Sequence, residues 1–463
     1  MSLSKNIYDN IALLESTFPV GKSFDILTRH LTLGDTKAYW LGINGLTKSD
    51  ILQQIFALLQ YPLYTKDTTI EDIQLYVNAK IGYCQAELSE DFPSITKSIL
   101  SGCSVLVVDG FSTFLILDTR SYPQRSISEP DTEKVLRGAK DGFTETLVQN
   151  TALVRRRIRN PKLTFEIHEI GADSKTDVSI AFIDGIVDTT LLNALRDRLS
   201  SLNVTSLTMG SKSLEELIIR KKWFNPLPSI YMTERPDVAC SYLLEGYIVV
   251  IVDNSPAVLV LPCTIFQFTQ SPEDYYKNPS TGNYFRFIRF GCIFISLFLM
   301  PLFLLITNYY NNIGKIRLFV FVLFVEVGLD IFKYSSSHAS SSFSNSMSII
   351  GGLIISDIAI ELKWTNLEAI FYGAITLLST LSLASVEFGE GIRIYRIILV
   401  LAAGFGQIPG FIIASVAVFI SIITTPTFAR SSYLWPLFPF NKEALMTLLF
   451  RYPTAKAQPS KRW

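Results

Sequence analysis

The sequence predicts an α+β or α/β cytoplasmic region of two subdomains, followed by a polytopic α-helical membrane domain with four to five spans. Hydrophobic residues make up 49% of the 463 residues, which is a high share for a soluble protein. The excess lies after Tyr284, where apolar runs approach the roughly 20 residues that a bilayer-spanning helix needs. Before Tyr284, apolar and charged residues alternate as they do in soluble domains.

Charge and cysteine content narrow the class of protein further. The formal net charge is zero, which does not suggest a nucleic-acid partner. The first 18 residues have no apolar signal core, so we expect the first 280 residues to stay in the cytoplasm. Lys277, Arg286 and Arg289, just ahead of the first membrane helix, agree with the positive-inside rule. The five cysteines show no metal-ligand spacing, and we expect them to be reduced.

Residues 1–125 are expected to form the first cytoplasmic subdomain. The pattern predicts a strand at residues 36–46 and an amphipathic helix that begins at Ser49. Residues 104–118 predict a β-hairpin that turns at Asp109-Gly110, because this dipeptide tolerates the backbone angles of a tight turn. A charged helical connector is expected at residues 126–162.

Residues 163–280 are expected to form the second α/β subdomain. FEIHEIG and DVSIAFIDGIV predict strands, VTSLTMG (residues 204–210) a short strand, and TTLLNALRDRL and SLEELIIRKK helices. A second hairpin is predicted at residues 247–261, with its turn at Asp253-Asn254. Its pattern resembles that of the first hairpin, as either an internal duplication or two ordinary hairpins would produce.

The membrane helical domain is expected at residues 281–428, followed by a basic C-terminal tail at residues 429–463. The second apolar segment either crosses, which gives five spans, or is re-entrant, which gives four and keeps the basic tail cytoplasmic. The last segment is interrupted at residues 406–410 and is predicted to be one kinked, tilted helix rather than two crossings. The candidate segments are Phe287–Ile306, Ile316–Phe332, Met347–Ile360, Leu367–Val386 and Ile397–Ile423.

No catalytic motif is present in the sequence. There is no nucleophile elbow, phosphate-binding loop, zinc-protease motif or kinase signature. The three histidines are scattered and are interpreted as structural or solvated. We therefore expect no enzymatic activity, no cofactor and no metal site.

Acidic residues inside the apolar third are the main functional signal. Glu326 and Asp330 share one helical face because they lie four residues apart, and Asp357 lies in the next apolar segment. A carboxylate is costly within a bilayer and persists where it faces water or a partner. These three residues are the candidate ion pathway, and helix packing is the alternative. Other acids of this region are interpreted as interfacial, with Lys333, Lys363, Arg393 and Arg396 as their ion-pair partners.

A basic cluster in the connector is a candidate contact site. Arg155, Arg156 and Arg157 lie beside a predicted helix. The cluster could contact another subunit or partner, bind anionic lipid, or form an ordinary solvated helix face. All three arginines are candidate intersubunit or partner contacts.

Several longer motifs resemble the A subunits of GerA-family spore germinant receptors. The longest is EPDTEKVLRGAKDGFTETLVQNTALVRRRIRNPKL (residues 129–163). TERPD (residues 233–237), VDNSP (252–256) and PEDYY (272–276) follow in the order of that family. Residues 325–332 and the tail at residues 432–451 are similar to one subfamily of these A subunits.

The resemblance implies an oligomeric membrane protein of the bacterial spore germination apparatus. It implies a homo-oligomer, with five subunits, that conducts monovalent cations across the inner membrane of the endospore. Its large N-terminal region would lie on the cytoplasmic (core) side, and other small membrane subunits would be its partners. The alternative is a non-conducting membrane-anchored scaffold or assembly factor, which the short loop after the first span and the basic tail leave open. Proton-coupled transport is a weaker reading, since no inverted repeat is visible.

Overall fold

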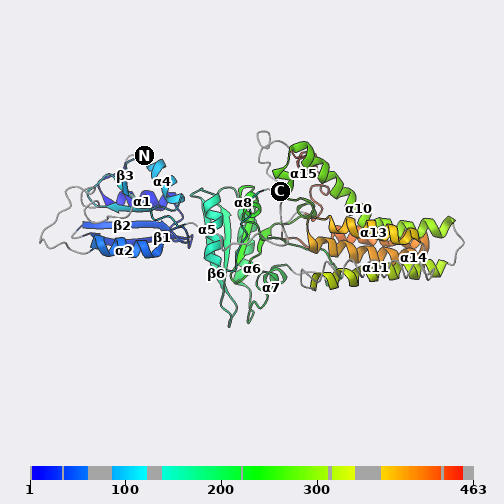
Figure 1. The fold of residues 1–463 in the computed structure, drawn as a ribbon. Helices are drawn as coiled ribbons and strands as arrows, with labels where there is room; N and C mark the ends of the chain where they lie inside the picture. The colour runs from blue at the N-terminus through cyan, green and yellow to red at the C-terminus, as the bar shows by residue number, and fades with distance from the viewer. Residues whose placement is uncertain are drawn as a thin grey trace. The chain divides into compact units, whose positions relative to one another are not determined.

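The computed structural model describes residues 3–33, 36–60, 86–121, 138–219, 223–310, 315–338, 367–428 and 432–451. They form two compact units, one built on two β-sheets and the other on long helices (Figure 1). The sheet unit comprises residues 1–135, 139–218 and 232–262, and the helical unit comprises residues 136–138, 219–231 and 263–463. The chain therefore enters the helical unit at residues 219–231 before it returns to the sheet unit.

The first sheet is antiparallel, with the strand order β1-β2-β4-β5-β3. Helices α1 and α4 cover one of its faces and α2 covers the other, so that an apolar core lies on each side (Figure 1). The elements are α1 (Ile7–Thr17), β1 (Ile26–Leu33), β2 (Thr36–Ile43), α2 (Ser49–Gln60), β3 (Ala86–Ser89), α4 (Phe92–Leu100), β4 (Ser104–Val108) and β5 (Phe114–Leu117). Every side chain of β4 is buried because this strand is covered on both faces.

The second sheet repeats the arrangement of the first. Its strand order, β6-β7-β9-β10-β8, matches that of the first sheet strand for strand along the hydrogen-bonded ladder. Each sheet is preceded in sequence by a helix of 11 residues, α1 or α5. The elements are α5 (Leu147–Arg157), β6 (Leu163–Ile170), β7 (Thr176–Ile183), α6 (Thr189–Ser200), α7 (Ser211–Ile218), β8 (Tyr231–Thr233), α8 (Pro236–Leu244), β9 (Ile248–Val252) and β10 (Val258–Leu261).

The same hydrogen bond ties each hairpin turn to the helix that precedes its sheet. The Ile7 backbone N–H at the start of α1 donates to Asp109 Oδ1 over 3.1 Å. The Leu147 N–H at the start of α5 donates to Asp253 Oδ1 over 3.0 Å. Each carboxylate thus satisfies an N-terminal donor that the helix itself leaves unpaired.

A buried asparagine in each helix makes a second matching contact. Asn10 Oδ1 accepts from the Ser4 N–H (3.0 Å), and Asn10 Nδ2 donates to the Ser4 carbonyl (2.7 Å). Asn150 makes the same pair of bonds with Thr144, at 2.8 and 2.6 Å. Two unrelated hairpins would not reproduce the strand order and both contacts. The structure therefore favours internal duplication, and the two halves are called repeat 1 and repeat 2 below.

Most of the local predictions for the sheet unit are confirmed. The hairpins at residues 104–118 and 247–261 form as β4-β5 and β9-β10. The predicted strand at residues 204–210 is wrong, because this segment joins no ladder. The carbonyls of Val204 and Thr205 instead accept hydrogen bonds from the turn between β6 and β7.

The helical unit contains the apolar third of the chain. Its elements are η1 (Ile265–Thr269), α9 (Glu273–Tyr276), α10 (Pro279–Tyr310), α11 (Lys315–His338), α13 (Leu367–Leu381), α14 (Val386–Ile423) and α15 (Lys442–Leu449). Among the described helices, residues 279–308 and 386–423 are long and apolar enough to cross a membrane. The predicted span at residues 367–386 is too long, because α13 ends at Leu381 and Ser385 begins the next helix as its N-cap. The predicted segment at residues 347–360 lies outside the described residues.

Helix α14 is a hairpin of two helical arms, not one continuous rod. Gln407 has the non-helical angles φ 51° and ψ −141°. Tyr395 Oη and Ser421 Oγ lie 2.8 Å apart, whereas a straight helix would separate these residues by about 39 Å. A Cβ on Gly410 would lie 2.5 Å from the Ala402 carbonyl oxygen, so the turn requires glycine there. The prediction of one kinked, tilted helix is therefore wrong.

Candidate functional site

The helical unit contains a buried polar cluster to which four helices contribute. Arg396 of α14 and Glu326 of α11 form an ion pair, with 2.9 Å between Arg396 Nη2 and Glu326 Oε2. Arg396 Nη1 donates to the Ser296 carbonyl of α10 (3.0 Å) and to Thr380 Oγ1 of α13 (3.2 Å). The Ser296 and Thr380 hydroxyls lie 2.7 Å apart. One guanidinium therefore joins all four helices.

This cluster is almost completely shielded from solvent. Arg396 is 1% exposed and Glu326 is 2% exposed. Charged groups at such a depth are tolerated when each is paired and hydrogen-bonded. Glu326 Oε1 has no hydrogen-bond partner among the described residues. The cluster thus holds an acceptor that its own geometry does not use.

A second ion pair lies beside the first. Asp330 Oδ1 is 2.6 Å from Arg393 Nη2, and both side chains are partly exposed, at 25% and 16%. Asp330 follows Glu326 by one turn of α11, and Arg393 precedes Arg396 by one turn of α14. Two carboxylates of one helix therefore face two guanidiniums of another. Asp357, the third residue of the candidate ion pathway, lies outside the described residues.

The arginines of the connector occupy three different environments. Arg155 is 0% exposed and lies inside the sheet unit, so we do not retain it as a contact for another subunit. Arg156 is exposed on α5. Arg157 is partly buried and pairs with Asp141 over 2.6 Å. Burial alone would raise the pKa of Asp141, but the hydrogen bond and charge of Arg157 hold this pKa below its ordinary value.

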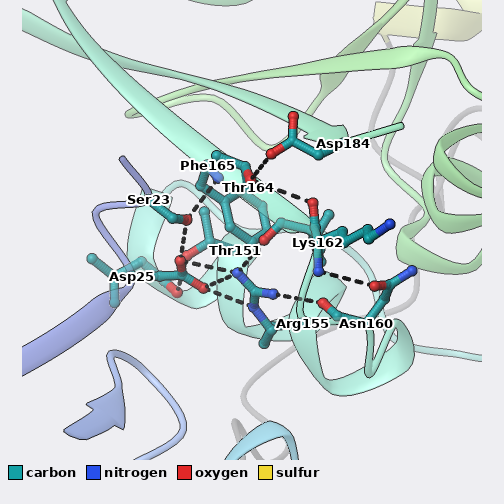
Figure 2. Close-up of polar contacts among 11 residues, drawn as sticks. Ser23, Asp25, Thr151, Arg155, Asn160, Lys162, Thr164, Phe165 and Asp184 are labelled. Carbon is teal, nitrogen blue, oxygen red and sulfur yellow. Dashed lines mark hydrogen bonds and ion pairs between the residues drawn. The ribbon is translucent and has the colours of Figure 1, made fainter. Parts of the chain in front are cut away.

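Arg155 joins the two repeats (Figure 2). Its Nε and Nη2 donate to the two carboxylate oxygens of Asp25 over 2.8 and 3.0 Å. Its remaining donors bind the Asn160 and Leu163 carbonyls, at 3.2 and 2.9 Å. Asp25 precedes β1 of repeat 1, whereas Arg155 lies in the last turn of α5 of repeat 2. The bidentate geometry fixes how the repeats pack.

No metal-binding cluster is found in the part of the chain that the structure describes. No group of three or more His, Cys, Asp or Glu side chains there could hold an ion. Cys103, Cys240 and Cys263 are buried free thiols, and Cys292 is partly buried. Burial raises the pKa of the Cys240 thiol to about 12, which leaves it unreactive at neutral pH.

Sequence reasoning missed several residues of these clusters. Ser296 and Thr380 gave no signal, because hydroxyls are common in membrane helices. Asp25 gave none either, because its partner lies 130 residues away in sequence. Arg393 and Arg396 were considered only as partners for interfacial acids. Their three-residue spacing, which matches one face of a helix, could have indicated a ladder with Glu326 and Asp330.

Comparison with known proteins places this chain in one family. The family model described as Bacillus/Clostridium GerA spore germination protein matches residues 14–462. Stage V sporulation protein AF of Bacillus subtilis is 33% identical, over 98% of this chain and 95% of that protein. Spore germination protein KA of the same organism is 29% identical, over 97% of this chain and 85% of that protein.

Among solved structures, the N-terminal domain of the A subunit of the Bacillus megaterium spore germinant receptor GerK3 is 27% identical. It aligns with a TM-score of 0.43, over 56% of this chain and 96% of that chain. The near full-length family match and the relatives identify the protein as a membrane-associated spore germination protein. The chain belongs to the GerA family of spore germination proteins.

Proposed function

We propose that this protein is a subunit of a homo-oligomeric channel that releases monovalent cations during spore germination. The channel would lie in the inner membrane of the endospore, with the sheet unit on the cytoplasmic (core) side. Five subunits and small membrane proteins of the germination apparatus complete the proposed assembly. Its relatives are named as spore germination proteins, and these names support a role in germination. They do not identify a conducted ion.

The observation that carries the proposal is the charged ladder between α11 and α14. Glu326 and Asp330 place two carboxylates within an apolar helix, where a charge is retained mainly for a water-filled path or a partner. Asp330 is partly exposed, and one carboxylate oxygen of Glu326 accepts no hydrogen bond from any described residue. Carboxylates on a water-lined helix face would attract cations and repel anions.

The ends of the membrane domain support an even number of crossings. The Arg451 N–H after α15 donates to Asn283 Oδ1 near the start of α10 (2.6 Å), and Asn283 Nδ2 donates to the Arg451 carbonyl (3.3 Å). Entry and exit of the chain therefore lie on one side of the bundle. The arms of α14 also return together, since Asn225 contacts both Tyr395 (3.3 Å) and Thr425 (2.8 Å).

Helices α11 and α13 run parallel within the helical unit. Ala369 belongs to the same apolar cluster as Val322, and Gly373, one turn later on α13, lies against Val325 and Leu329, which are farther along α11. The described residues supply five helical segments of this bundle: α10, α11, α13 and the two arms of α14.

Cysteine accessibility tests this topology. A cysteine at Gly406, beside the α14 turn, should react with a membrane-impermeant maleimide from the outer side. A cysteine at Thr424, at the end of the second arm, and a reporter fused after Phe268 should both be found on the cytoplasmic side. Outer-side labelling at Thr424 would show that α14 crosses only once.

Ion flux tests the proposed function. In liposomes with equal amounts of assembled protein, we expect the wild type to pass potassium rather than chloride. The Glu326→Gln, Asp330→Asn variant removes two negative charges and leaves Arg393 and Arg396 uncompensated. Potassium flux should fall by about tenfold, with selectivity shifted toward chloride, because the ladder becomes net positive. Glu443→Gln, an exposed acid of α15, is the matched control.

A non-conducting scaffold is the second candidate function, and a specific observation favours it. Glu326 and Asp330 are both paired with arginines, so helix packing alone could explain their presence. In that case wild-type liposomes would pass no potassium, and the double amide variant would lose assembly. Normal wild-type conductance with unchanged selectivity in the variant would instead move the pathway away from Glu326 and Asp330.

A further inference from the structure

The two repeats differ in how much of their leading helix is buried. Helices α1 and α5 each have 11 residues and can be matched position by position. The positions buried in both are Ile7/Leu147, Asn10/Asn150, Ile11/Thr151 and Leu14/Val154. Helix α5 buries three more residues, Ala152, Leu153 and Arg155. The positions that are buried in both helices face the sheet of their own repeat. The three residues that are buried only in α5 therefore indicate an additional contact of that helix.

Repeat 1 supplies part of that additional contact. Arg155 binds Asp25, which directly precedes β1. Ala152 belongs to the apolar core of repeat 1, and its Cβ lies 2.9 Å from the position that a Cβ on Gly45 would occupy. Leu46, the next residue after Gly45, is 0% exposed in the same core. The outer face of α5 therefore docks on the surface formed by Asp25, Gly45 and Leu46.

The matching face of α1 is uncovered in the single chain. Ala12 and Glu15, which correspond to Ala152 and Arg155, are both exposed. Tyr8 on the same face is 60% exposed, and its hydroxyl accepts a hydrogen bond from Lys37. Glu15 has no ion-pair partner among the described residues. We call Tyr8, Ala12 and Glu15 the α1 face.

Repeat 2 carries the matching docking surface, and it is also uncovered. Lys162 directly precedes β6, as Asp25 precedes β1, and its side chain points away from the Arg155 network (Figure 2). Gly185 and Ile186 follow β7 as Gly45 and Leu46 follow β2. Ile186 is 50% exposed, whereas Leu46 is fully buried. We call Lys162, Gly185 and Ile186 the repeat 2 surface.

We propose that the repeat 2 surface of one subunit docks on the α1 face of a second copy of this chain. The contact would reproduce between subunits the packing that joins repeat 1 to repeat 2 within one subunit. The charges support this, because the internal pair of Asp25 and Arg155 becomes Lys162 and Glu15, with both signs exchanged. Such a head-to-tail contact is heterologous, and it forms a ring when the rotation between successive subunits closes. This interface requires that the protein forms a homo-oligomer, as the proposed function states.

Charge exchange tests the pairing of Glu15 with Lys162 in the full-length protein in detergent. Glu15→Lys and Lys162→Glu, each alone, should raise the concentration at which the oligomer dissociates by about tenfold or more, because like charges then face each other. The double variant should return to within about threefold of the wild type, since an opposite-charge pair is restored. Asp50→Lys with Lys48→Glu, at exposed positions by α2 on the opposite sheet face, is the matched control.

Disulfide trapping tests the geometry independently of the charges. Tyr8→Cys with Ile186→Cys should form a ladder of cross-linked oligomers under oxidation, whereas each single variant should not. The last band of the ladder gives the number of subunits in the ring. A monomeric wild type would contradict the homo-oligomer itself. An oligomeric wild type with neither a ladder nor a charge-exchange effect would overturn this interface alone.

Discussion

Replacing Arg155 with methionine should destabilise the sheet unit more than any other single arginine change in the connector. The side chain is fully buried and makes four hydrogen bonds, two of them to Asp25. Methionine fills much of the same volume but leaves Asp25, which is 1% exposed, without its cation. The remaining Ser23 hydroxyl cannot neutralise the carboxylate.

The size of the effect follows from the cost of an unpaired buried charge. Removing one partner of a buried ion pair costs about 3–5 kcal/mol. For a domain of this size, 1 kcal/mol shifts the melting temperature by about 2–4 °C, so the expected fall is roughly 6–20 °C. Asp25→Leu combined with Arg155→Met should cost less than the sum of the single changes, since no charge is left unpaired.

Thermal unfolding of the full chain in detergent, followed by the fluorescence of the buried Trp40, measures this loss. Arg156→Met is the matched control, because Arg156 is exposed on the same helix and should change stability by less than about 1 kcal/mol. A loss below about 1 kcal/mol for Arg155→Met, or strict additivity in the double variant, would refute the reasoning.

Two further predictions concern titratable groups of the sheet unit. Burial lowers the pKa of His168, so the unfolded state binds its proton first. Stability should therefore fall as the pH drops from about 6.5 through the lowered pKa. Chemical unfolding at several pH values measures this, and an unchanged slope in His168→Gln would contradict it. With a pKa of about 12, Cys240 should be thiolate in about one molecule in ten thousand at pH 8. Cys240 should therefore resist iodoacetamide until the protein is unfolded. Alkylated Cys240, detected by mass spectrometry after brief labelling of the native protein, would contradict this prediction.

Local sequence patterns were sufficient for much of the sheet unit. Asp109-Gly110 predicted its hairpin because few dipeptides accept a tight turn, and Gly110 indeed has a φ of 90°. The segment at residues 204–210 failed because its apolar alternation could not show which backbone groups it would bind. The identical strand order of the two sheets was also invisible, since strand order depends on pairing between distant segments.

The turn in α14 shows a different limit. The glycines and proline near Gln407 indicate an interruption of the helix, but the same residue types occur at a kink and at a reversal of the chain. By length alone, each arm is too short to predict a separate crossing. What decides between the two is the contact between Tyr395 and Ser421, which involves the far ends of both arms. Only tertiary packing supplies that information.

The membrane acids show why a cost argument cannot by itself assign a function. The expense of burying Glu326 requires compensation, but a water-filled path and an arginine satisfy this requirement equally well. The four-residue spacing of Glu326 and Asp330 does not discriminate, because one helical face can line a pore or meet another helix. Arg393 and Arg396 do discriminate, since they lie one turn apart on their helix, as the two acids do, and their guanidiniums lie within 3 Å of the carboxylates. In the described arrangement the ladder is neutral, so cation attraction requires that the carboxylates and guanidiniums separate.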